Sequence, residues 1–164
     1  PNPTLRMRAL PVELDSDGMP PEEMLSLIRD MKRVCGERDG IGLAAQQVGL
    51  IKPVIIYGVP NGNGKYDLVG VVNPKVLDES DETNVREEGC LSFPKLYIPV
   101  ERPDEGWFDD VGFFERRELF GMSARIFCHE ADHTNGILFI DRTTQEVRER
   151  IRGELQRIAK EYNR

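Results

Sequence analysis

The 164-residue chain lacks any apolar run of membrane-spanning length and has only three cysteines and one tryptophan. The first absence predicts no membrane-spanning helix, and no basic-then-apolar leader is seen. Three irregularly spaced cysteines do not suit a disulfide framework, so we expect reduced thiols and a cytoplasmic protein. Basic residues are outnumbered 22 to 29, and the net charge of −7 argues against DNA and membrane surfaces as partners.

The remaining pattern predicts one domain over residues 1–164, in the α+β class. Apolar residues at helical spacing predict a helix over 21–36. A second helix is expected from Leu119 to about Asn135, and a C-terminal helix from about Thr144, over 144–164. β-rich runs between the helices predict strands at 54–59, 68–72 and 96–100. The segment N-G-N-G-K at 61–65 predicts a hairpin between the first two strands.

The only two histidines lie four residues apart, in C-H-E-A-D-H at 128–133. On a helix, His129 and His133 project from one face and can share a metal ion. Glu130 can then reach a water on that ion, which is the physical content of the H-E-x-x-H motif. The alternative is a chance pair of histidines. Because the helix carries apolar residues and should be buried, two unpaired histidines there would be costly, and we favour a metal site.

Residue chemistry alone does not identify the third metal ligand. An acid downstream of His133 is possible, but no ligand-bearing pattern repeats there. Cys35 lies on the apolar stripe of the first helix and suits core packing, while Cys128 points about 100° away from His129. Cys90, in E-E-G-C-L-S at 87–92, follows a glycine that permits close approach of the backbone, and the leucine and serine after it suit the start of a strand. A free cysteine is also often a small buried apolar residue.

Three motifs follow one another along the chain: G-I-G-L-A-A-Q-Q-V-G at 40–49, E-E-G-C-L-S at 87–92, and H-E-A-D-H at 129–133. The first is not a phosphate loop, because no Gly-Lys-Ser/Thr follows, and alone it suits a turn before a strand. Together the three resemble the motifs of peptide deformylases. The opening P-N-P-T-L-R and G-I-L-F-I-D-R at 136–142 extend the resemblance over most of the chain.

The resemblance implies small mixed or antiparallel sheets around a central metal-binding helix. It also implies hydrolysis of the N-formyl group from the initiator methionine of nascent peptides. Cys90, His129 and His133 would bind one divalent ion and leave a fourth position for the attacking water. Glu130 would be the general acid and base. In the family the ion is typically Fe²⁺, with Zn²⁺, Ni²⁺ or Co²⁺ as replacements, and the ligand set does not itself choose.

Further roles follow from the same resemblance. The Gln47 amide and the Leu91 backbone N–H would stabilise the oxyanion, and Gly42 would pair with the substrate backbone. We expect an extended segment at Gln46 and Gln47, so that the two amides face opposite ways. Candidate walls of a pocket for the methionine side chain are Ile41, Met122 and Ile126, with the stem of Arg125 at its rim.

Several positions depart from the family pattern. Cys128 replaces a usual glutamine, and Tyr97 stands where relatives often carry arginine near the mouth of the site. The segment from Arg102 to His129 is several residues shorter than is usual in the family, and its part 103–119 lacks clear strand alternation. Both features predict a trimmed hairpin and a more open rim.

The C-terminal helix has two possible roles. Its narrow apolar stripe consists of Val147, Ile151, Leu155 and Ile158. The surrounding arginines either pair with neighbouring glutamates while the helix packs on the body, or dock on ribosomal RNA, because a C-terminal helix contacts the ribosome in bacterial relatives. Gly153 weakens the helix and favours support by packing or a partner.

We expect the deformylase-like protein to be a monomer, and two other functions remain as alternatives. A metalloprotease of the H-E-x-x-H type would have its third ligand downstream of His133. A non-catalytic protein could retain the fold, but a relic would lose its base first, and Glu130 is intact.

Overall fold

The computed structural model describes residues 2–110 and 115–162. Its strands are β1 (Gly42–Ala44), β2 (Val54–Pro60), β3 (Tyr66–Val72), β4 (Lys75–Glu79), β5 (Thr83–Cys90), β6 (Phe93–Pro103), β7 (Glu105–Asp110) and β8 (Glu115–Phe120). They form three antiparallel sheets, in the orders β1-β2-β3, β4-β7-β8 and β5-β6. The predicted hairpin between the runs at 54–59 and 68–72 is the β2-β3 pair.

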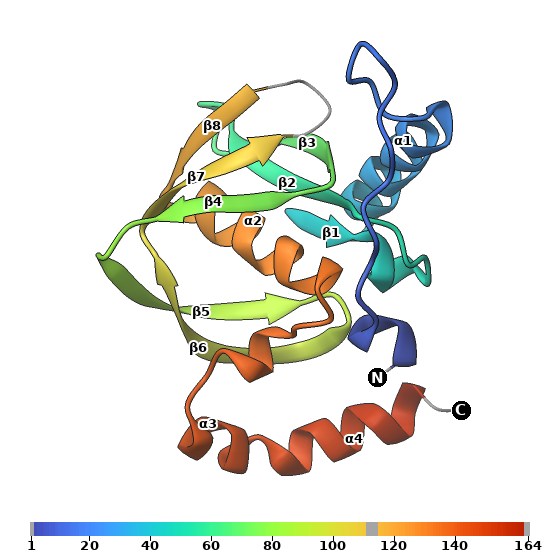
Figure 1. Cartoon of the computed structure of the whole chain (residues 1–164). Coiled ribbons are helices and arrows are strands. Elements are labelled where there is room, and N and C mark those ends of the chain that lie inside the picture. The colour runs from blue at the N-terminus through green and yellow to red at the C-terminus, as the bar shows by residue number, and fades with distance from the viewer. Residues whose placement is uncertain (1, 111–114, 163–164) are drawn as a thin grey trace.

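Among the described residues, four α-helices and three short 3₁₀ turns complete the fold. The helices are α1 (Glu22–Glu37), α2 (Gly121–Thr134), α3 (Gln145–Arg150) and α4 (Arg152–Tyr162). The 3₁₀ turns are η1 (Pro3–Arg6), η2 (Ala45–Val48) and η3 (Phe139–Asp141). Helix α2 lies in the middle of the sheets, α1 lies beside β2 and β3, and α4 runs beneath β5 and β6 (Figure 1). The predicted α+β class and central helix are confirmed.

Helix α1 forms where its apolar spacing predicted it. Glu22 and Glu23 lie in its first turn, where their negative charges interact favourably with the helix dipole. Its buried face, which includes Met24 and Cys35, packs against the β1-β2-β3 sheet. The prediction that Cys35 belongs to the core is confirmed, since it is fully buried and burial raises the pKa of its thiol to about 11.

Helix α2 is buried along almost its whole length, from Ser123 to Thr134. It begins at Gly121, so the prediction that it starts at Leu119 is wrong: Leu119 belongs to β8 and is buried in a core cluster. Gly121 has φ +54, a conformation that suits glycine and lets the strand turn directly into the helix. The predicted end is confirmed, with Gly136 in the left-handed conformation at φ +72.

The C-terminal segment differs from the single helix that was predicted. It breaks at Ile151, which has φ −88 and ψ 0, into α3 and α4. The side chain of Ile151 is buried, and the low helix propensity of Gly153 reduces the cost of the break. The predicted apolar stripe does pack on the body, against a cluster that includes Phe93 and Ile98 of β6. Arg157 forms ion pairs with two glutamates of α4.

The segment 103–119 forms the β7-β8 hairpin, although its sequence does not alternate clearly. The tip of the predicted trimmed hairpin, at 111–114, lies outside the described residues. Within residues 2–110 and 115–162, no helix is both long and apolar enough to span a membrane.

Candidate metal centre and active site

Three potential metal ligands from two elements converge beside α2. Cys90 ends β5, and His129 and His133 lie one turn apart on α2. One ligand atom from each, the Cys90 Sγ and a ring nitrogen of each histidine, all lie within 4.8 Å of one another. The Cys90 Sγ is 3.3 Å from Nε2 of His133. Leu91 and Ser92 were expected to begin a strand, but they form a turn, and Cys90 ends β5 at a shift in its pairing with β6.

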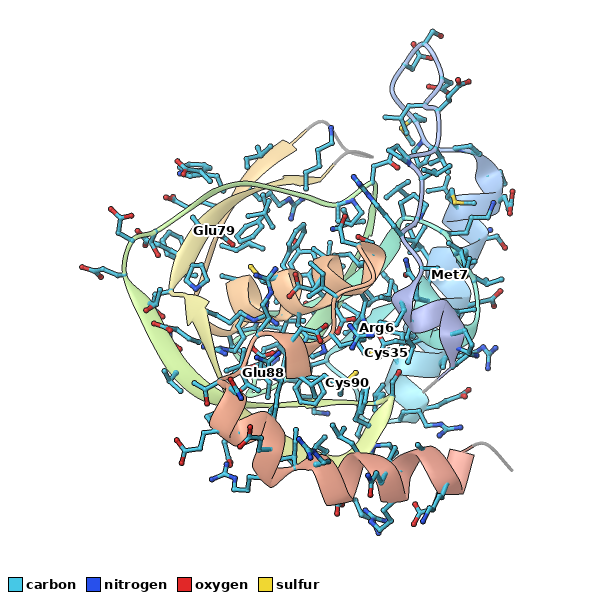
Figure 2. All side chains as sticks on the ribbon, turned by 60° about the horizontal axis from the view of Figure 1, so that its bottom comes forward. Arg6, Met7, Cys35, Glu79, Glu88 and Cys90 are labelled. Atoms are coloured by element: carbon cyan, nitrogen blue, oxygen red, sulfur yellow. The ribbon has the colours of Figure 1, made fainter. Side chains whose placement is uncertain are left out.

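Glu88 holds the first histidine, a role that was not predicted from the sequence. Its Oε2 lies 2.9 Å from Nδ1 of His129, and Arg102 donates to both of its oxygens at 3.0 and 3.1 Å. Burial raises the pKa of Glu88, but hydrogen bonds from His129 and Arg102 outweigh burial and lower it to about 2. Since alternate residues of a strand share a face, its place two residues before Cys90 was an available signal. Figure 2 shows Glu88 and Cys90 together between β5 and α2.

The two imidazoles differ in their protonation chemistry. Burial lowers the pKa of His133 well below its ordinary value, which keeps it in the neutral form that binds metals. Burial acts in the same direction on His129, but hydrogen bonds with Cys90 and Glu88 outweigh it and raise the pKa of His129 to about 10. Binding of an ion by His129 would therefore release a proton.

Glu130 lies next to His129 and is only 4% exposed. Burial raises the pKa of its carboxyl to about 7, with weaker influences from neighbouring charges. Among the described residues, its Oε2 is buried without a hydrogen-bond partner. A Cβ atom at Gly42 would collide with the other carboxylate oxygen, so glycine there leaves the space that Glu130 occupies.

Gln47 and Gln46 face different surroundings, although the predicted extended segment is wrong. Both lie on the 3₁₀ turn η2. The Gln47 Nε2 donates to the Cys90 Sγ at 3.4 Å, and its Oε1 accepts from the backbone N–H of Ala44 at 2.7 Å. Gln46 is 1% exposed, and its amide has no partner among the described residues.

A cavity of about 630 Å³ joins most of the predicted site residues. Its walls include Ile41, Gly42, Gln47, Cys90, Leu91, Met122, Arg125, Ile126, His129 and Glu130. His133 is fully buried and does not line it. Arg125 also borders the cavity, and its guanidinium donates to Glu88, which lines the same cavity. Tyr97 is at the rim, 66% exposed, with its ring over Gly89.

Cys128 lies apart from this cavity. It lines a larger cavity of about 860 Å³, which includes none of the three potential metal ligands. Burial raises the pKa of its thiol to about 12. Its place in the second cavity agrees with the expectation that its side chain points away from His129.

The described residues fit a divalent metal ion. One thiol and two imidazoles converge, and His129 is oriented by a carboxylate, as metal-binding histidines usually are. The buried Glu130 oxygen without a partner suits a nearby water. Within the described part of the chain, Cys90 and the two histidines form the one cluster with metal-ligand geometry. It therefore contains Cys90 and no acid downstream of His133.

The fold and the site define an α+β hydrolase of the H-E-x-x-H type with a cysteine as the third potential metal ligand. The family model for polypeptide deformylase matches residues 1–149, and the chain belongs to that family. It is 38% identical to the peptide deformylase of Thermotoga sp. (strain RQ2) over 166 residues, which cover 99% of this chain and 95% of the relative.

Solved structures agree with this assignment. The crystal structure of peptide deformylase 1B from Arabidopsis thaliana, in complex with an inhibitor, matches with a TM-score of 0.85 and 36% identity. The match covers 99% of this chain and 88% of that one. Peptide deformylase from Plasmodium falciparum matches with a TM-score of 0.84 and 34% identity, over 99% and 94% of the two chains. The protein is thus an enzyme of the peptide deformylase class.

Proposed function

We propose that the protein hydrolyses the N-formyl group from the initiator methionine of nascent polypeptides, as a cytoplasmic monomer. The observation that carries the proposal is the convergence of Cys90, His129 and His133 beside the buried carboxyl of Glu130. Those three residues would hold one divalent ion. By family resemblance we propose Fe²⁺, with Zn²⁺, Ni²⁺ or Co²⁺ as replacements. When bound, the ion supplies Lewis-acid chemistry, which polarises a carbonyl group and acidifies water.

Glu130 would move the proton. In its ionised form the carboxylate accepts a proton from the attacking water, and it then delivers that proton to the departing amine. Burial raises the pKa of this carboxyl, which makes its ionised form a better proton acceptor than an exposed glutamate. Loss of formate leaves the free amino group of methionine.

The residues around Glu130 would orient the substrate. The Gln47 amide already lies against Cys90, where it can turn to donate to the oxyanion, and the Leu91 backbone N–H is the second donor. Gly42 begins β1 and lines the cavity, so the substrate backbone can pair with it there. Ile41, Met122 and Ile126 would form the walls of the methionine pocket.

The test combines metal analysis with an assay. The protein is purified without oxygen, its metal content is measured, and formate release is followed with a formyl-methionyl peptide. Glu130→Gln should keep the metal and lose turnover by about a hundredfold or more. The exposed Glu13→Gln is the matched control and should behave like the parent protein. Cleavage of unformylated peptides would instead favour a metalloprotease, and absence of any turnover by the metal-loaded protein would favour a non-catalytic role.

We also propose that the outer face of α3 and α4 contacts the ribosome. Since the apolar stripe is covered by the body, Arg148, Arg152 and Lys160 remain exposed on the outside. Truncation would uncover the core cluster, so replacing these three residues by glutamine is the better test. At a given salt concentration, the variant should co-sediment with ribosomes more weakly than the parent. Co-sedimentation of the parent should also weaken as salt rises. Unchanged sedimentation, at an unchanged melting temperature, would leave only the packing role.

A further inference from the structure

The potential metal ligands come from two elements that are held together across the site. Cys90 is on β5, whereas His129 and His133 are on α2. A shift of the helix relative to the strand would separate the thiol from the imidazoles. The contacts that join α2 to β5 therefore decide whether the three ligand atoms converge.

Arg125 is the side chain of α2 that crosses to both β5 and β6. It lies one helical turn before His129 and is 3% exposed. Its Nη1 donates to the Glu88 Oε1 at 2.6 Å and to the Val100 carbonyl at 3.0 Å. Its Nη2 donates to the backbone and side-chain oxygens of Asn84, at 2.9 and 2.6 Å. The guanidinium is thus fixed by four acceptors on two strands.

Glu88 transmits this cross-link to the metal site. Its Oε1 accepts from Arg125 and from Nε of Arg102, and its Oε2 accepts from Nη2 of Arg102 and pairs with Nδ1 of His129. The carboxylate cannot rotate without losing one of these partners. Its orientation in turn sets the ring of His129, because a carboxylate on the second nitrogen of a metal-binding histidine fixes the ring and its tautomer.

We propose that Arg125 is a positioning residue for the metal centre: it fixes α2 on β5 and, through Glu88, orients His129 for the ion. This inference rests on the proposed metal binding by Cys90 and the two histidines. Lysine cannot replace arginine in this role, since its single ammonium group cannot serve acceptors on two strands with the planar fork of a guanidinium.

The experiment measures metal binding directly. Cobalt(II) is titrated against a competing chelator, and its visible and thiolate charge-transfer absorption is recorded for the parent, Arg125→Lys and Arg125→Met. We expect the dissociation constant for cobalt to rise about 10- to 100-fold, with a shifted spectrum. Arg157→Met is the matched control, because Arg157 is also ion-paired but lies on the exposed side of α4. It should bind cobalt as the parent does.

Circular dichroism establishes that each variant is folded before it is compared. If Arg125→Met does not fold, Arg125→Lys decides, since it retains the charge beside Glu88. A folded Arg125→Lys with the parent's cobalt affinity and spectrum would overturn the proposal. A parent protein that binds cobalt but releases no formate would refute the proposed function without contradicting the inference about Arg125.

A double-mutant cycle tests the route through Glu88. In a Glu88→Gln background, Arg125→Lys should raise the cobalt dissociation constant by a smaller factor than in the parent, because the route through Glu88 is already weakened and only the contacts of Arg125 with Asn84 and Val100 remain to be lost. Independent effects that multiply would show that Arg125 does not act through Glu88, and would refute the proposed route.

Discussion

Replacing Gly42 by alanine should slow turnover while leaving the metal site occupied. An ideal Cβ at this position would lie 2.8 Å from Cγ2 of Ile126 and 3.1 Å from Cδ of Glu130, and closer still to the Glu130 Oε1. Carbon atoms in contact are ordinarily about 3.5–4.0 Å apart. The side chain of Ile126, that of Glu130 or both must therefore move by about 1 Å. The Glu130 carboxylate lies at the end of a flexible side chain, so we expect it to move.

The expected loss is larger in turnover than in stability. A displacement of about 1 Å in a catalytic group can reduce the rate on the order of a hundredfold. The overpacking should cost about 1–3 kcal/mol in the free energy of unfolding. None of the three atoms nearest to the added Cβ belongs to Cys90, His129 or His133, so the metal content should remain that of the parent.

The assay is formate release together with metal analysis, and Gly36→Ala is the matched control. Gly36 lies on α1, and an added Cβ there meets nothing within 4 Å. That variant should keep full turnover and gain about 0.5–1 kcal/mol of stability from helix propensity. If Gly42→Ala retains its metal and turns over within about threefold of the parent, the claim that Gly42 protects the position of Glu130 is wrong.

Three further predictions concern the oxyanion, the pocket and the C-terminal helix. Gln47→Ala should lower kcat by a larger factor than it raises KM, with a total loss of transition-state stabilisation of about 3 kcal/mol. Gln46→Ala should leave kcat near the parent value, and the reverse result would show that Gln46 is the oxyanion donor. A formyl-Met peptide should exceed formyl-Ala in kcat/KM by about 2 kcal/mol, because only the longer side chain fills an apolar pocket, and equal values would rule the pocket out. Ile158→Ala, at a site 3% exposed, should lower the unfolding free energy by about 2–5 kcal/mol in denaturant titrations, while Val85→Ala, 63% exposed, should change it by about 0.5 kcal/mol or less.

Strands were harder to predict than helices for an identifiable reason. The β2-β3 hairpin has apolar runs on both sides of a turn signal, and it was found. All five residues of β4 are exposed, and β5 exposes charged residues such as Arg86 and Glu87, so neither shows the alternation of a half-buried strand. These strands are held by backbone pairing with β7 and β6, which leaves little trace in local composition.

The sequence by itself determined the local parts of the site. A helix repeats every 3.6 residues, so the spacing of His129 and His133 places both imidazoles on one face, with Glu130 beside them. Glycine at position 42 and the amide at position 47 were assignable only through the family motifs. Their contacts with Glu130 and Cys90 came with the structure.

Only the tertiary structure decided how distant segments meet. The convergence of Cys90 with the two histidines depends on β5 lying against α2, and no periodicity of either segment encodes that contact. The same holds for the buried contacts of Glu88 with Arg102 and Arg125, which are charged residues that a sequence pattern assigns to the surface. A buried charge is stable only where packing supplies its partners, and those partners are chosen by the fold as a whole.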